Sequence, residues 1–183
     1  LPAIAPHIHM IIVDILSAMG ANRIITMDLH STQIQGFAKI PFDNLYSRKI
    51  FYSVIKNNNF NPEKTVVLAP DIGSAKMSQS YAKTLGMHFA LIEKRRFAPN
   101  QAEVNHLIGN LDSLDVLIID DMVDTAGTTV SAADAAIAKG ANSVTVVATH
   151  GVLSGPAVQR LNESVIDKLI VTDTILIPEE KQI

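Results

Sequence analysis

A pair of carboxylates followed by a loop of small and hydroxyl-bearing residues is the stretch with the clearest chemical character. The apolar run 116–119 is typical of a buried strand, and it delivers Asp120 and Asp121 directly into a turn-rich loop. The loop ends in Thr125, Gly127, Thr128 and Thr129. Backbone N–H groups at a helix start can surround a phosphate together with hydroxyls, and carboxylates before them can bind sugar hydroxyls or a metal. The stretch therefore predicts a sugar-phosphate site, without the lysine of the GxxxxGK[ST] loop.

Three further groups of polar residues come at the ends of expected strands. They are Asp28 and His30 after the strand at 23–27, the turn 70–74 (PDIGS) after the strand at 65–69, and the basic run 94–96 (KRR) after the strand at 88–93. Ligands of open α/β sheets collect at the carboxyl ends of the strands, so all three groups are candidates for function. From residue types alone, each also has an ordinary explanation: a structural histidine, a common turn and a solvated basic surface.

Two features stay open between a structural and a chemical role. Asp124 is a candidate general base, and it is equally suited to shaping the turn or binding the sugar. Ser154 and Gly155 follow the strand expected at 143–149, where they suit either the cap of a helix toward Asn162 or a ligand contact.

Strands and helices are expected to alternate along the chain. Apolar periodicity and turn residues predict strands at 23–27, 65–69, 88–93, 116–119, 143–149 and 169–172, and helices at 10–19, 45–56, 75–85, 128–139 and toward 162. Asp43 and Asn44 are the start signal of the second helix. The pattern is typical of an α/β fold with a mainly parallel, twisted sheet and helices on both faces.

A turn-rich segment, 57–63 (NNNFNPE), divides this pattern and is predicted to be a linker. We therefore expect residues 1–56 to be the tail of an upstream domain. Residues 64–183 are expected to form a second domain that is truncated at its end.

The composition is that of a globular enzyme. The chain has 183 residues, 48% of them hydrophobic, with a formal net charge of −3 and no cysteine. A negative charge disfavours a nucleic-acid surface built on phosphate contacts, and the lack of cysteine excludes disulfides and thiolate metal sites. No apolar run is long enough for a membrane helix, and the start does not have the form of a signal peptide. We expect a cytoplasmic protein that binds neither nucleic acid nor membranes.

The stretch 116–129 (VLIIDDMVDTAGTT) resembles the motif that binds phosphoribosyl diphosphate (PRPP) in type I phosphoribosyltransferases and in PRPP synthetases. Five other stretches, TMDLHSTQIQGF, FDNLY, APDIGSAK, EKRR and THGVLSGPA, are similar to PRPP synthetases, also called ribose-phosphate diphosphokinases. Together they cover most of the chain in the family's order. The resemblance implies a type I phosphoribosyltransferase-like fold and the C-terminal portion of such an enzyme.

The activity that this resemblance implies is transfer of the diphosphoryl group of ATP to the C1 hydroxyl of ribose 5-phosphate, giving PRPP and AMP. It implies Lys94 and Arg96 as catalytic residues, and Mg²⁺ as a cofactor with His30 and Asp71 as metal contacts. The diphosphate of ATP would bind at Asp71, Gly73 and Ser74. The ribose 5-phosphate site would comprise Asp120, Asp121, Asp124, Thr125, Ala126, Gly127, Thr128 and Thr129.

Three alternatives remain beside this activity. A phosphoribosyltransferase would share the sugar-phosphate loop but would not require the segment DLHSTQIQGF. A catalytically silent regulatory subunit is permitted by Ser74 and Met77, which stand where the family commonly has glycine and a basic residue. The chain also looks like a fragment that is inactive alone, because segments of the family before Leu1 and after Ile183 have no counterpart in it. The family further implies a homo-oligomer, often a hexamer.

Overall fold

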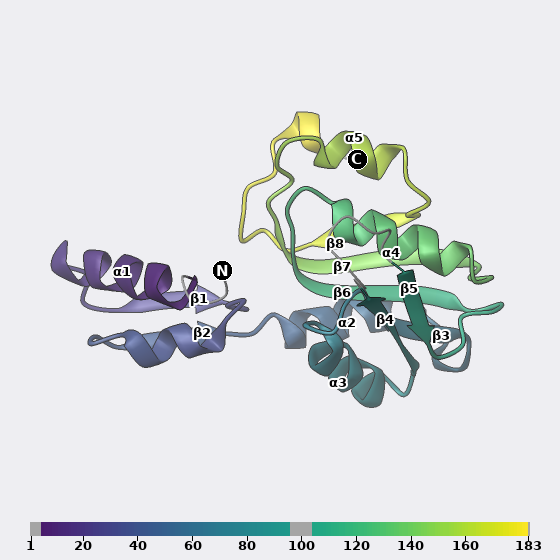
Figure 1. Cartoon of the computed structure of the whole chain (residues 1–183), viewed down its shortest axis with the longest axis horizontal. Helices are drawn as coiled ribbons and strands as arrows, with labels where there is room; N and C mark the ends of the chain where they lie inside the picture. The colour runs from purple at the N-terminus through teal and green to yellow at the C-terminus, as the bar shows by residue number, and fades with distance from the viewer. Residues whose placement is uncertain (1–4, 96–103, 183) are drawn as a thin grey trace. The chain divides into compact units, whose positions relative to one another are not determined.

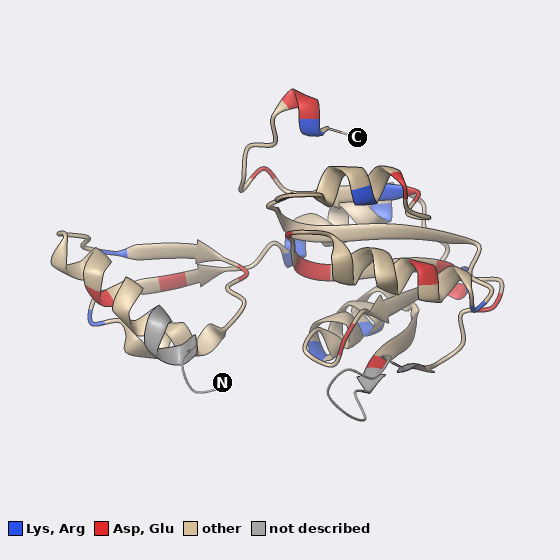
Figure 2. Cartoon of the chain, turned by 45° about the horizontal axis from the view of Figure 1, so that its top comes forward, with Lys and Arg blue, Asp and Glu red and all other residues tan. Residues whose placement is uncertain are grey.

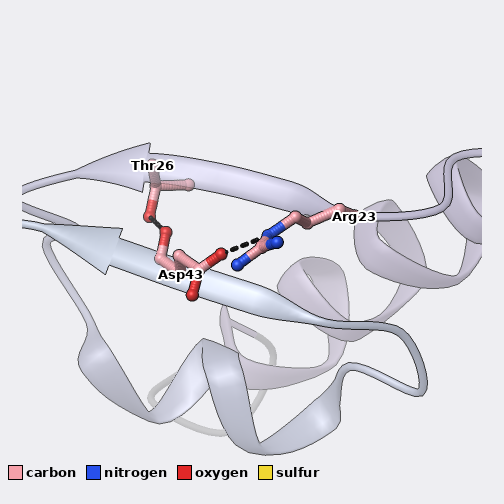
Figure 3. A network of polar contacts seen from close by, with 3 residues as sticks. All are labelled: Arg23, Thr26 and Asp43. Atoms are coloured by element: carbon pink, nitrogen blue, oxygen red, sulfur yellow. Dashed lines mark hydrogen bonds and ion pairs between the residues drawn. The ribbon is translucent and has the colours of Figure 1, made fainter.

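The computed structural model describes residues 5–95 and 104–182, and the chain divides into two compact units, Leu1–Lys49 and Ile50–Ile183 (Figure 1). The described part of the first unit consists of α1 (Ala5–Ala18), β1 (Ile24–Met27), the 3-10 helix η1 (Thr32–Phe37) and β2 (Phe42–Leu45). β1 and β2 are parallel. Beside them, Arg23 Nε donates to Asp43 Oδ2 at 2.5 Å, and Thr26 Oγ1 donates to the Asp43 carbonyl at 3.5 Å (Figure 3). The hydrogen bond from Arg23 lowers the pKa of Asp43.

One expected helix start is wrong. Asp43 and Asn44 are predicted to begin a helix, but both lie in β2, and the helix α2 begins at Arg48. The Asn44 side chain explains the difference, because its Oδ1 accepts hydrogen bonds from Thr26 Oγ1 and the Leu29 N–H, both at 3.1 Å. The oxygen that could cap a helix instead ties β2 to β1 and to the residues that follow β1.

The second unit is organised around a mainly parallel sheet. Among the described residues it has six strands in the order β5-β4-β3-β6-β7-β8. They are β3 (Thr65–Ala69), β4 (His88–Arg95), β5 (Val104–Ile108), β6 (Asp115–Val123), β7 (Ser143–Gly151) and β8 (Lys168–Val171). Neighbouring strands are parallel except β4 and β5, which are antiparallel. The predicted fold class is confirmed, whereas the sequence pattern does not predict β2 or β5.

Helices cover both faces of this sheet (Figure 1). The helices are α2 (Arg48–Asn57) and α3 (Ala75–Leu85) on one face, and α4 (Gly127–Ile137) and α5 (Ala157–Asn162) on the other, with the 3-10 helices η2 (Pro62–Lys64) and η3 (Glu179–Lys181). Alternate residues of a strand point to opposite faces. Val66 and Leu68 of β3 therefore pack in the core under α4 and α5, and Val67 packs in the core under α2 and α3.

The central strands are apolar because both of their faces are covered. β3 and β7 contain no charged residue, and charges lie mainly on helices, in loops and toward strand ends (Figure 2). The run 116–119 of β6 is fully buried, as predicted for a central strand. Within the described residues, no helix has the length and apolar character needed to cross a membrane.

The division between the units falls before the expected linker. Phe51 and Ile55 of α2 are 2% and 1% exposed, and they pack in the core of the second unit with Tyr81 and Leu117. The segment 57–63 consequently lies inside the second unit, between α2 and β3. That the residues before it are the tail of an upstream domain stays a prediction.

Candidate active site

The candidate residues of the second unit meet at the carboxyl edge of three neighbouring parallel strands. β3 is followed by the turn 70–74, β6 by the loop 124–126 and β7 by the loop 152–156. β6 continues beyond the end of β3, since Leu68 pairs with Ile118 and β3 ends one residue later. Asp120 and Asp121 therefore lie within β6, and the expectation that they stand in a loop is wrong. β7 explains this, because it pairs with β6 as far as Val123 and Gly151.

Asp120 and Asp121 form a partly buried pair of acids. Burial, the carboxylate of Asp121 and that of Asp71 raise the pKa of Asp120 to about 7, although the Asp121 N–H donates to Asp120 Oδ1 at 2.9 Å and opposes the rise. Asp120 is thus close enough to Asp121 and Asp71 for their negative charges to raise its pKa. A neighbouring positive charge or the hydroxyl donors of a sugar would stabilise the charged form of Asp120.

Ser74 closes the turn after β3 onto Asp71. Its N–H and its Oγ donate to Asp71 Oδ1 at 2.9 and 3.1 Å, and Oγ lies 3.1 Å from the Asp71 carbonyl oxygen as well. Ser74 is buried, and its φ of −84° is ordinary right-handed backbone. Gly73 is exposed, and a Cβ there would stand 3.3 Å from Asp71 Oδ1. The serine side chain therefore orients the candidate metal ligand, while glycine leaves the outer side of the turn without a side chain.

The start of α4 has no capping side chain. Its N-cap residue is Ala126, which has a left-handed φ of 60°. The helical hydrogen bonds begin with the Val130 N–H, which donates to the Ala126 carbonyl at 2.9 Å. The N–H groups of Gly127, Thr128 and Thr129 are consequently without an acceptor among the described residues. Such groups carry the positive end of the helix dipole, and together they can bind an anion.

Two residues that follow β7 hold the loop before α4. Ser154 Oγ donates to Asp124 Oδ1, and the Ser154 N–H donates to the Asp124 carbonyl at 3.0 Å. Arg160 of α5 donates from Nη1 to the Thr125 carbonyl at 2.9 Å. Ser154 is therefore not the cap of α5, whose N-cap residue is Pro156. The hydrogen bonds between Ser154 and Asp124 favour a role for Asp124 in shaping the turn. Arg160 was not predicted, because no feature of the sequence singles it out.

The candidates of the first unit follow β1. Asp28 has a positive φ of 44°, and its Oδ2 accepts hydrogen bonds from the Ser47 N–H at 3.0 Å and from the Ser47 hydroxyl. His30 is exposed in the segment before η1. The described part of the chain contains no group of three or more His, Asp or Glu side chains that could hold a metal. Because His30 and Asp71 belong to different units, metal binding at these residues stays a prediction.

The two catalytic candidates, Lys94 and Arg96, lie on either side of Arg95, the last described residue of β4. Lys94 is in β4, where its backbone pairs with Asn105 of β5. Arg96 lies outside the described residues. Their catalytic role stays a prediction that rests on the sequence.

The fold defines a broad class of protein. An adenine phosphoribosyltransferase from Giardia lamblia superposes with a TM-score of 0.53 at 17% identity, over 68% of this chain and 77% of that one. Adenine phosphoribosyl transferase from Trypanosoma brucei gives a TM-score of 0.51 at 20% identity, over 72% of this chain and 66% of that one. The chain accordingly has a type I phosphoribosyltransferase-like fold.

The sequence comparisons narrow this class. Ribose-phosphate pyrophosphokinases from Chlorobaculum tepidum and Fusobacterium nucleatum are 45% and 40% identical over 91% and 97% of this chain, which correspond to 51% and 56% of their own lengths. Phosphoribosylpyrophosphate synthetase from Mycobacterium smegmatis superposes with a TM-score of 0.87 at 36% identity, over 96% of this chain and 56% of that one. Residues 96–183 match the phosphoribosyl synthetase-associated domain.

This chain is a relative of the ribose-phosphate pyrophosphokinases, and the resemblance seen in its motifs is confirmed. It spans about half the length of the curated relatives that it matches.

Proposed function

We propose that this chain provides the ribose 5-phosphate and diphosphate sites of a ribose-phosphate diphosphokinase. The enzyme transfers the diphosphoryl group of ATP to the C1 hydroxyl of ribose 5-phosphate and releases PRPP and AMP. The observation that carries the proposal is the uncapped start of α4 beside the paired acids of β6, in a relative of the ribose-phosphate pyrophosphokinases.

The 5-phosphate is assigned to the start of α4. It would accept hydrogen bonds from the N–H groups of Gly127, Thr128 and Thr129, which have no acceptor among the described residues. The hydroxyls of Thr125 and Thr128 are exposed and would add donors. The loop contains no lysine, so backbone groups and the helix dipole must supply most of the positive potential that attracts the phosphate.

The ribose ring is assigned to the acids of β6. Asp120 and Asp121 would accept hydrogen bonds from the 2- and 3-hydroxyls, directly or through Mg²⁺. Either arrangement stabilises the carboxylate form of Asp120, whose pKa is raised to about 7 by burial and by the neighbouring acids. Carboxylate oxygens are ligands that Mg²⁺ prefers, and a bound cation would reduce the repulsion between Asp120 and Asp121. Asp71 and His30 are each proposed as Mg²⁺ contacts.

The chemistry requires no covalent nucleophile on the protein. Binding of the phosphate at one end of the sugar and of the hydroxyls at the other would fix the C1 oxygen for in-line attack on the β-phosphorus of ATP. The new bond joins this oxygen to the β-phosphorus, the bond from the β-phosphorus to the oxygen that AMP retains breaks, and the proton of the C1 hydroxyl passes to solvent. We assign Lys94 and Arg96 to neutralise the negative charge on the diphosphoryl group during transfer, to which bound Mg²⁺ would contribute.

The alternatives have weaker support. The solved phosphoribosyltransferases share the fold at 17% and 20% identity, whereas ribose-phosphate pyrophosphokinases reach 45%. A silent regulatory subunit is suggested by Ser74, whose Cβ could obstruct a phosphate. That side chain is turned onto Asp71 rather than outward, which favours an active site at this turn.

The reaction is tested by measuring AMP and PRPP formed from ATP, Mg²⁺ and ribose 5-phosphate. The 183-residue chain is compared with the same chain completed by those segments of the Chlorobaculum tepidum relative that it does not span. We expect turnover in the completed protein and none in the chain alone. If neither protein turns over while both bind ribose 5-phosphate, the silent-subunit alternative is correct, and Ser74 and Met77 are the first residues to revert.

Asp120→Asn with Asp121→Asn tests the sugar site directly. We expect ribose 5-phosphate to bind at least about tenfold more weakly in the presence of Mg²⁺, because two charged acceptors are lost. Titration calorimetry measures this change. Asp112→Asn removes an exposed acid that precedes β6 at the other end of the strand, and it should leave the affinity unchanged. Unchanged affinity in the double variant would remove these acids from the role proposed.

A further inference from the structure

Arg160, a residue of α5, contacts the loop 124–126 that precedes α4, here called the phosphate loop. Its Nη1 donates to the Thr125 carbonyl at 2.9 Å. The same nitrogen lies 3.5 Å from the point that a Cβ on Gly127 would occupy. The guanidinium therefore lies against the loop and within van der Waals distance of the first residue of α4.

This contact fixes the direction of one peptide group. A trans peptide is planar, so the Thr125 carbonyl and the Ala126 N–H point in opposite directions. With the carbonyl directed at Arg160, the Ala126 N–H is directed away from that guanidinium. A rotation of this peptide would break the hydrogen bond and turn the N–H toward Arg160.

The backbone of Ala126 needs such support. Its φ of 60° is in the left-handed region, which residues other than glycine adopt when surrounding contacts hold them there. Ala126 is also 3% exposed, so the residue that begins the uncapped turn is packed in the protein. Ser154 holds the loop at Asp124, one residue before Thr125, and Arg160 holds it at Thr125 itself.

We propose that Arg160 is a positioning residue for phosphate binding. By holding the Thr125 carbonyl, it keeps Ala126 in the left-handed backbone from which α4 starts, so that the N–H groups of Gly127, Thr128 and Thr129 face the 5-phosphate of ribose 5-phosphate. Arg160 itself does not touch that phosphate. This inference rests on the proposed function of the α4 start. It gives α5 a role in phosphate binding, although Arg160 lies outside the sequence motif at 116–129.

Three variants separate positioning from charge. Arg160→Met removes the donor and the charge, whereas Arg160→Lys retains a charge and one donor for the carbonyl. Lys168→Met is the charge control. It removes one positive charge at the amino end of β8, and the candidate site lies at the carboxyl ends of the parallel strands. Calorimetry with ribose 5-phosphate and Mg²⁺ is carried out at low and at high salt. Amide NMR spectra of the ligand-free chain report the local geometry of Ala126 and Gly127.

We expect Arg160→Met to weaken ribose 5-phosphate binding about tenfold at both salt concentrations, because a fixed hydrogen bond is lost rather than a screened attraction. Arg160→Lys should recover most of the affinity, and Lys168→Met should bind as the unmodified chain does. In the ligand-free spectra, Arg160→Met should shift the amide resonances of Ala126 and Gly127.

The outcomes distinguish the inference from the function on which it rests. If the unmodified chain binds ribose 5-phosphate and Arg160→Met binds it equally well, the inference is overturned and the function stands. If the loss of affinity in Arg160→Met disappears at high salt, Arg160 acts by long-range attraction of the negatively charged phosphate. That result would also overturn the positioning role. If the unmodified chain does not bind ribose 5-phosphate at all, both the proposed function and the inference fail.

Discussion

The acid pair of β6 makes the stability of the protein depend on pH. The folded-state pKa of Asp120 is raised to about 7 from an ordinary value of 3.8, chiefly by burial. Between these values the folded chain binds more protons than the unfolded chain, so the stability contributed by this group falls as the pH rises from 4 toward 7. A ligand that requires charged Asp120 therefore binds against this preference for the protonated form.

Asp120→Asn should remove this dependence. We expect its melting temperature to exceed that of the unmodified chain by a few degrees at pH 8, where the carboxylate is charged, and by clearly less at pH 5, where only the first part of the loss has occurred. Thermal unfolding followed by circular dichroism at both pH values measures the difference. A melting temperature lowered equally at pH 5 and pH 8 would mean that Asp120 stabilises the fold through its hydrogen bond rather than opposing it by its charge.

Some residues of the candidate site could be predicted from the sequence, and others could not. Asp120 through Thr129 are recognisable because their types are contiguous and follow an apolar run. Ser154 and Arg160 act on the same loop from 30 and 35 residues away, so only the pairing of β6 with β7 and the placement of α5 bring them there. An isolated arginine in a helical stretch gives no local signal of such a contact.

At the scale of elements, buried apolar runs are predictable and polar strands are not. β3, the centre of β6 and β7 were expected within a few residues, since strands covered on both faces are continuously apolar. β2 (FDNL) and β5 (VNHLI) carry polar residues, and each lies at an edge of its sheet. Their backbones are strands because a neighbouring strand offers hydrogen bonds, which is information that no local pattern contains.

Gly109, directly after β5, shows how closely this edge packs. It has a φ of 113°, and a Cβ there would stand 2.8 Å from Ala90 Cβ and 3.0 Å from the Phe89 carbonyl oxygen of β4. Gly109→Ala should therefore destabilise the protein by about 2 kcal/mol or more, through both strain and overlap. Urea unfolding measures the loss.

Gly86→Ala is the matched control for this variant. Gly86 also has a positive φ, of 69°, but nothing within 4 Å would meet its Cβ. It should cost about 1 kcal/mol, the price of strain alone. Equal losses in the two variants would show that the β4 and β5 strands separate enough to accept a side chain at Gly109.

At the scale of the molecule, the two hydrophobic clusters found among the described residues consist of residues of the second unit. We expect a fragment of residues 48–183, which keeps α2 whole, to fold cooperatively and to bind ribose 5-phosphate within about threefold of the full chain. Urea unfolding and calorimetry test this. A fragment without a cooperative transition would show that residues before Arg48 are needed for the second unit to fold. The homo-oligomer and the cytoplasmic location stay predictions.

Ser154 and Arg160 contact a loop that precedes them by 30 and 35 residues, which matters while the chain is being synthesised. Between the loop 124–126 and these two residues lie α4 and β7, and in the folded protein β7 is paired with β6 along its length. A chain leaving the ribosome from its N-terminus thus exposes the acids and threonines well before the residues that shape their loop. A chain in which β7 and α5 are not yet in place therefore carries the residues of the site but lacks the two contacts, from Ser154 and Arg160, that hold its loop.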